Sequence, residues 1–138
     1  MPTRPTVLFV CVSNRGKSVM AEAISRSNAA EVFEAESAGT AAEIGGSVNE
    51  TSTRVLSEIG VNIGDHEPRQ LTNELMVTAD LIVAVGTAAV IRPPAGVVVE
   101  VWDTDEPSAR GIGGVERMRS IRDEIVGRVD DLAQRLRR

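Results

Sequence analysis

Short runs of apolar residues alternate along this chain with segments in which apolar side chains recur every three or four positions. The runs have the length of buried strands, which predicts strands over residues 6–10, 34–38, 81–85 and 97–101. The third of these runs is apolar throughout, which is typical of a strand buried on both faces of a sheet.

The segments between these strands have helical spacing. A first helix is predicted from Met20, Ala23, Ile24 and Ser27, which fall on one helical face. A second helix is predicted over residues 48–59, with Asn49 as its N-cap and Gly60 as the glycine that ends it. A short helix is expected to begin near Thr72, and the strongest pattern predicts a long helix over residues 115–136.

Strands that alternate with helices predict right-handed crossovers and an α/β fold. The expected architecture is a four-stranded parallel sheet with helices on both faces, in one domain over residues 1–138. Ligands of such sheets bind at the carboxyl ends of the strands. Cys11 and the loop over residues 102–107 both lie at such ends, so we expect them to share one site.

The composition is that of an ordinary globular protein, with 42% hydrophobic and 25% charged residues. A net charge of −5 gives no support to nucleic-acid binding, which usually leaves a basic footprint. No apolar stretch approaches the ~18 residues of a membrane-spanning helix, and the start lacks the pattern of a signal peptide. A single cysteine excludes an internal disulfide, so we expect a cytoplasmic protein that binds neither membranes nor nucleic acid.

Cys11 is the one cysteine of the chain, and a polar loop separates it from the first helix. Backbone N–H groups of such a loop and the positive end of a helix dipole can bind a tetrahedral oxyanion and stabilise a thiolate. The expected oxyanion loop comprises Val12, Ser13, Asn14, Arg15, Gly16, Lys17 and Ser18. Lys17 supplies positive charge and Ser18 can donate a hydrogen bond to the thiolate. The alternative is a buried, inert cysteine before an ordinary turn.

Several motifs in order along the chain resemble the low-molecular-weight protein tyrosine phosphatases and their arsenate reductase relatives. The motifs are Cys11 with Asn14, Lys17 and Ser18, the segments 20–23 and 37–40, the loop 102–107 and the segment 114–119. The resemblance implies a low-molecular-weight phosphatase-like fold, which is a flavodoxin-like three-layer sandwich. It also implies that Cys11 is the nucleophile and that the 102–107 loop carries the general acid.

The chain departs from the family pattern at three places. Lys17 stands where the family has arginine, which exchanges a planar bidentate donor for a point charge. Glu106 precedes the loop proline where the family usually has aspartate, so Glu106 is the first candidate for the acid, followed by Asp105, with Asp103 also possible. The chain has no tyrosine and 2% aromatic residues, which disfavours an aryl phosphate substrate.

Arsenate reductases of this fold that use thioredoxin need two further cysteines, and this chain has none. The loop and the single cysteine look most like the mycothiol-dependent arsenate reductases of actinobacteria. The resemblance implies arsenate as substrate (with phosphate or sulfate as its mimic), mycothiol as co-substrate thiol, a mycoredoxin-type partner and no bound cofactor. Two alternatives remain: a phosphatase acting on a phosphoprotein or a small phosphate ester, and a non-catalytic oxyanion-binding regulatory module.

Three further residues have less specific interpretations. His66 is the only histidine and is expected to be a solvated loop residue, since no second histidine or cysteine can complete a metal site with it. Arg15 is a second anion contact or an exposed loop residue, and the exposed position is favoured. Trp102 is expected to pack in the core rather than contact a substrate.

Overall fold

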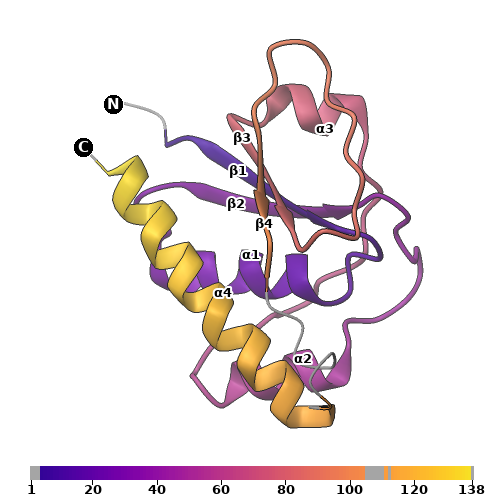
Figure 1. The fold of residues 1–138 in the computed structure, drawn as a ribbon, viewed down its shortest axis with the longest axis vertical. Helices are drawn as coiled ribbons and strands as arrows, with labels where there is room; N and C mark the ends of the chain where they lie inside the picture. Colours follow the sequence, from indigo (N-terminus) through magenta and orange to yellow (C-terminus); the bar gives the residue numbers. More distant parts are fainter. Residues whose placement is uncertain (1–3, 105–110, 112, 138) are drawn as a thin grey trace.

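The computed structural model of the protein describes residues 4–104, 111 and 113–137 (Figure 1). The elements are, in chain order, β1 (Thr6–Cys11), α1 (Lys17–Asn28), β2 (Glu34–Gly39), α2 (Glu50–Ser57), α3 (Asn73–Thr78), β3 (Leu81–Val85), β4 (Val99–Trp102) and α4 (Gly114–Leu136). In the described part of the chain, no helix combines the length and the apolar character that crossing a membrane requires.

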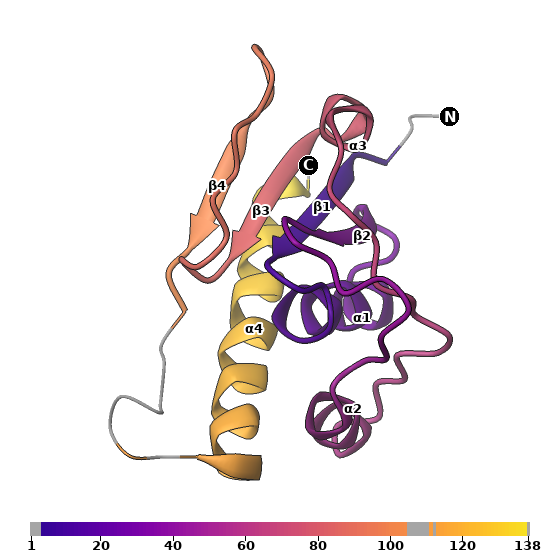
Figure 2. The same cartoon turned by 90° about the vertical axis from the view of Figure 1, so that its right-hand side faces the viewer.

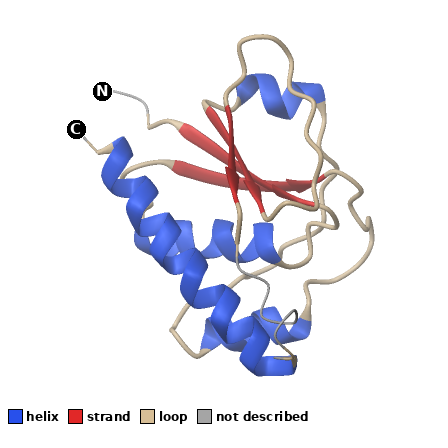
Figure 3. Ribbon diagram, viewed as in Figure 1, coloured by secondary structure: helices blue, strands red, loops and turns tan. Residues whose placement is uncertain are grey.

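The four strands form one parallel sheet in the order β2-β1-β3-β4, which Figure 2 shows from the side. The strands register closely, with Val10 of β1 opposite Ala38 of β2 and Ala84 of β3. Helices α1, α2 and α4 lie on one side of the sheet and α3 on the other (Figure 3). The predicted α/β fold, with helices on both faces of a four-stranded parallel sheet, is confirmed.

The helix ends follow local capping chemistry. The Asn49 side chain accepts hydrogen bonds from the backbone N–H groups of Thr51 and Ser52, so α2 begins one residue later, as an N-cap requires. Gly60 follows with φ of 76°, a conformation that few residues other than glycine adopt. Helix α2 is thus shorter than the pattern predicted.

One periodicity assignment is wrong: Ile59 lies beyond the end of α2, with 41% of its surface exposed. Ser27 lies within α1 as predicted, at an exposed position. Both residues lie near the end of a helix, where a periodic pattern defines the boundary least well.

The larger core lies between the sheet and helices α1 and α4. Phe9 occupies its centre, with ring centroids 6.4 Å from Phe33 and 5.5 Å from Trp102. Trp102 is 3% exposed and its indole N–H donates to Glu100, so the expectation that this residue packs in the core is confirmed. A smaller core lies on the α3 side, around Leu8 and Ile82.

Ion pairs connect α2 to α4. Glu58, which directly follows α2, accepts hydrogen bonds from Arg119 and Arg122 of α4 at 2.6–2.9 Å. The Arg119 hydrogen bond is the main cause that holds the pKa of Glu58 at about 2, below its usual 4.5. Arg122 of α4 also donates to the Val55 carbonyl of α2. Its guanidinium therefore links the two helices by an ion pair with Glu58 and by a hydrogen bond to the backbone.

We expect Glu58→Gln to lower the melting temperature at neutral pH. Because the folded-state pKa is the lower one, the unfolded chain binds more protons in acid, and the contribution of Glu58 decreases as the pH falls from about 4.5 to about 2. The melting temperatures of the variant and the natural protein should therefore converge over that range. Glu116→Gln is the matched control, because Glu116 pairs with Arg119 from a largely exposed position. A difference in melting temperature that does not vary with pH would contradict the lowered pKa of Glu58.

Candidate functional site

Cys11 ends β1 at the carboxyl edge of the sheet, and residues 12–16 of the oxyanion loop lead into α1 at Lys17. The first bond of the helix runs from the Met20 N–H to the Gly16 carbonyl, so the loop turns into the helix without an intervening linker. The loop opens onto a cavity of about 410 Å³. It is lined by Cys11, Val12, Ser13, Gly16 and Lys17 of the first segment, and by residues 85–89 and Thr104 from later in the chain.

The end of β2 fixes the path of the oxyanion loop. A side chain at Gly39 would place its Cβ 2.4 Å from the Val12 carbonyl oxygen and 3.0 Å from the Asn14 nitrogen, so only glycine fits. The backbone beyond it holds the loop directly, because the Thr40 N–H donates to the Cys11 carbonyl and the Ala41 N–H to the Val12 carbonyl. The motif at 37–40 is therefore part of the site.

Asn14 is the buried centre of the loop. It is fully buried and has a φ of 58°, in the left-handed region where asparagine is among the few tolerated residues. Its Oδ1 accepts a hydrogen bond from the Arg69 backbone N–H at 2.8 Å. Because that partner can only donate, the amide orientation is fixed, and Nδ2 must face Ser18 and Ser37, at 2.9 and 3.0 Å.

This orientation determines the direction of the next hydrogen bond. The Ser18 oxygen accepts from Asn14 Nδ2, which leaves its own hydrogen to donate elsewhere. Cys11 Sγ lies 2.9 Å from the Ser18 oxygen. Ser18 can therefore donate to Cys11, and a hydrogen bond to sulfur stabilises the thiolate form in which a cysteine is nucleophilic. The role expected of Ser18 is compatible with this geometry.

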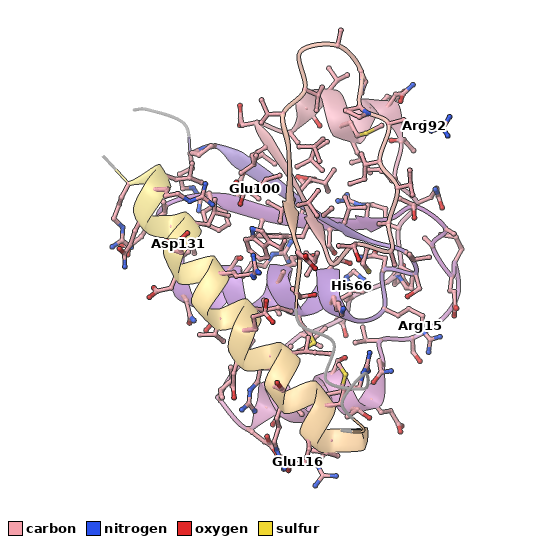
Figure 4. The ribbon with its side chains drawn as sticks, in the orientation of Figure 1. Arg15, His66, Arg92, Glu100, Glu116 and Asp131 are labelled. Carbon is pink, nitrogen blue, oxygen red and sulfur yellow. The ribbon has the colours of Figure 1, made fainter. Side chains whose placement is uncertain are left out.

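A second set of polar side chains lies behind the loop. Ser37 accepts from Asn14 and donates to Glu22, whose other carboxylate oxygen pairs with Arg26 at 2.7 Å. His66 lies 3.1 Å from the Asn14 carbonyl oxygen, and 11% of its side chain is exposed. The expectation of a solvated His66 is wrong: its imidazole, labelled in Figure 4, lies against the oxyanion loop at the Asn14 carbonyl.

Lys17 reaches across the cavity mouth. Its ammonium lies 3.3 Å from the hydroxyl oxygen of Thr104, the residue that follows β4 by two positions. Gly86, directly after β3, has a φ of 96°, and a Cβ there would come within 3.4 Å of the ammonium. The ends of β3 and β4 thus meet around one positive charge.

Arg15 lies away from the cavity. It donates to the Glu43 carboxylate and to the Ser47 carbonyl, and Figure 4 shows it on the outer side of the loop. The favoured position outside the anion site agrees with these contacts, although only about a third of the side chain is exposed. Arg15 therefore anchors the loop 43–47, and its contribution to a bound anion is limited to long-range charge.

The structure describes one of the three candidate acids, Asp103. Asp103 is exposed, and its carbonyl accepts a hydrogen bond from Arg128 of α4. Asp105 and Glu106 lie outside the described residues. The described segment before them ends at Thr104, which lines the cavity.

Sequence reasoning missed three contributors: Arg69, Gly86 and Thr104. Arg69 acts through its backbone N–H, which has no signal in the residue type. Gly86 and Thr104 could have been identified, because Gly86 directly follows the predicted strand 81–85 and Thr104 comes three residues after the predicted strand 97–101, both at the carboxyl edge.

Comparison with known proteins agrees with this fold and loop. Residues 6–138 match the low molecular weight phosphotyrosine protein phosphatase family, and the chain belongs to this family.

The relatives include reductases and phosphatases. Arsenate reductase 1 of Staphylococcus epidermidis is 25% identical over 136 residues, which cover 96% of this chain and 98% of that protein. The structure of a thioredoxin-dependent arsenate reductase from Corynebacterium glutamicum is 30% identical, with a TM-score of 0.77, covering 97% of this chain and 62% of that one. A tyrosine phosphatase from Erwinia amylovora has the same fold, with a TM-score of 0.85 at 23% identity over 99% of this chain and 95% of that one.

Proposed function

We propose that this protein reduces arsenate to arsenite through an adduct on Cys11. The observation that carries the proposal is the position of the chain's one thiol, which lies at an oxyanion loop, 2.9 Å from a hydroxyl oriented to donate to it. Arsenate is a tetrahedral oxyanion of the kind that backbone N–H groups and a helix N-terminus bind. Arsenate reductases among the relatives, at 25–30% identity, support this choice of substrate.

The first step forms one bond and breaks one. The Cys11 thiolate attacks arsenic and forms an S–As bond, an As–O bond breaks, and the departing oxygen takes a proton and leaves as water. Glu106 is the proposed proton donor and Asp105 the next candidate, since both follow Thr104 at the cavity wall. Lys17 and the loop N–H groups offset the negative charge of the anion.

The reducing electrons must come from outside the chain. With one cysteine, no intramolecular disulfide can form, so the arsenic has to be transferred to a second thiol. We propose mycothiol for this role: its sulfur bonds to arsenic and the Cys11–As bond breaks, which restores the thiolate. A mycoredoxin-type thiol then attacks the mycothiol sulfur. The S–As bond breaks with its electron pair on arsenic, which releases arsenite and leaves a mixed disulfide.

The test is arsenite production by the purified protein with three reducing systems supplied separately. These are mycothiol with mycoredoxin, glutathione with glutaredoxin, and thioredoxin with its reductase. Activity with mycothiol alone is the expected result. Activity with thioredoxin alone would overturn the thiol assignment and keep the reaction, whereas no arsenite in any system would overturn both.

Phosphatase activity is the second candidate, because the family includes phosphatases and an oxyanion loop of this geometry also suits a phosphoryl group. The cavity walls contain glycine, alanine, valine, serine, threonine, lysine and cysteine, and no aromatic ring lines the described part. A ring would therefore lack a stacking partner there. An aliphatic phosphoester or phosphoprotein is the better substrate class, and release of phosphate from such a substrate without arsenite production would favour this candidate.

We expect Lys17→Arg to tighten oxyanion binding by about threefold to tenfold, because a guanidinium offers two parallel donors where an ammonium offers a point charge. Calorimetric titration with arsenate and with sulfate measures the effect. Lys17→Met, which keeps the length and removes the charge, is the control and should weaken binding. If Lys17→Arg binds arsenate and sulfate no more tightly than the natural protein, this result would contradict the charge argument.

A further inference from the structure

We infer that Thr104 is an oxyanion-binding residue of this site, and that Lys17 orients its hydroxyl group toward the bound anion. The inference rests on the proposed function in one respect, which is that the anion in the cavity is taken to be the substrate. Thr104 and Lys17 would then act as a pair of donors from two different elements, one neutral and one charged.

The first argument concerns the hydroxyl hydrogen of Thr104. The Thr104 oxygen accepts a hydrogen bond from the Lys17 ammonium at 3.3 Å, and an ammonium can only donate. The hydroxyl hydrogen must therefore point away from Lys17. Among the described residues it has no acceptor, although Thr104 is more than nine-tenths buried. A buried donor without an acceptor is costly, so its presence points to a ligand.

The second argument concerns where that donor lies. Thr104 and Cys11 line the same cavity, so an anion bound at the oxyanion loop lies in the space onto which Thr104 opens. Contact with a cation polarises the O–H bond, which makes it a stronger donor to a negatively charged oxygen. Thr104 is thus suited to a tetrahedral anion above the thiol.

The third argument concerns the backbone at Gly86, which lies beside the contact between Lys17 and Thr104. Gly86 holds a φ of 96°, and an added Cβ would lie 3.4 Å from the Lys17 ammonium and 3.6 Å from the Thr104 hydroxyl oxygen. A side chain at this position would be strained by its φ, and its Cβ would lie in van der Waals contact with both groups. The glycine that follows β3 therefore lies directly beside the contact between Lys17 and Thr104.

The pair also accounts for how a lysine can serve in this loop. An arginine would present two donors in one rigid fork, whereas a lysine presents a single centre of charge. The Lys17 ammonium and the Thr104 hydroxyl oxygen lie 3.3 Å apart. Together they can offer two donors to one anion, one from each side chain. It follows that an arginine at position 17 should make Thr104 largely dispensable.

The test is a double-mutant cycle read by calorimetric titration with arsenate and with phosphate. Thr104→Val removes the hydroxyl at nearly constant shape and is expected to weaken binding about fivefold in the natural background. In the Lys17→Arg background the same change should cost less than about twofold. Thr104→Ser keeps the hydroxyl and is the matched control, with binding expected within about twofold of the natural protein.

Equal losses in both backgrounds, or no loss in the natural one, would overturn the inference. Thermal melts verify that each variant is folded, and Thr104→Ala replaces Thr104→Val if the latter unfolds. Arsenite production is measured separately: normal anion binding without arsenite production would contradict the proposed function and leave the role of Thr104 intact. A natural protein that binds neither anion would overturn the inference itself.

Discussion

Cys11→Ser is expected to abolish arsenite production, with a loss of about a thousandfold or more. A serine hydroxyl stays protonated at neutral pH, and the one side-chain partner that the described residues give position 11 is Ser18, which is oriented to donate to it. It therefore cannot form the adduct that carries the arsenic. The measurement is arsenite release under the reducing system that supports the natural protein, together with mass spectrometry of the protein incubated with arsenate.

The same variant separates the enzyme hypotheses from the non-catalytic module. Serine preserves the shape of the loop and its N–H groups, so phosphate binding by Cys11→Ser should stay close to that of the natural protein. Loss of turnover with retained binding identifies Cys11 as the nucleophile. Retained arsenite production would exclude it, and a natural protein that binds anions without any turnover would support the regulatory module.

Most of the fold could be predicted because each element carries its own signal. The apolar run 81–85 coincides with β3, and Asn49 and Thr72 act as the N-caps of α2 and α3. The errors lie at element ends: the last predicted strand is shifted, with β4 at Val99–Trp102, because pairing with β3 rather than the apolar run sets its limits.

The site could be predicted less completely, because its geometry depends on contacts between distant segments. The loop motif identified Cys11 and Ser18, which the structure brings to within 2.9 Å. No local pattern could bring His66 to the Asn14 carbonyl, 52 positions away, or Thr104 to Lys17, 87 positions away. Such contacts depend on how the carboxyl ends of the strands assemble, which the order of strands in the sheet decides.

The second large effect is expected for Asn14→Ala. The substitution removes the acceptor of the Arg69 N–H and the donor to Ser18 and Ser37, and it leaves an alanine at a φ of 58°. Unsatisfied buried groups and left-handed strain together should lower the free energy of unfolding by about 3–5 kcal/mol. Arsenite production should fall by about a hundredfold, since Ser18 is no longer oriented toward the thiol. Urea unfolding and the arsenite assay measure the two losses.

Asn14→Gly distinguishes the side-chain network from the backbone strain. Glycine adopts the left-handed conformation freely, so this variant should recover the part of the stability that strain costs, about 1 kcal/mol. It cannot restore the hydrogen bonds to Ser18 and Ser37, and its arsenite production should remain as low as that of Asn14→Ala. Full activity in the glycine variant would mean that the loop path set by Gly39 suffices to place Ser18 beside Cys11. Low activity in both variants would show that the thiol depends on a chain of donors that begins at the Arg69 backbone and ends at its sulfur.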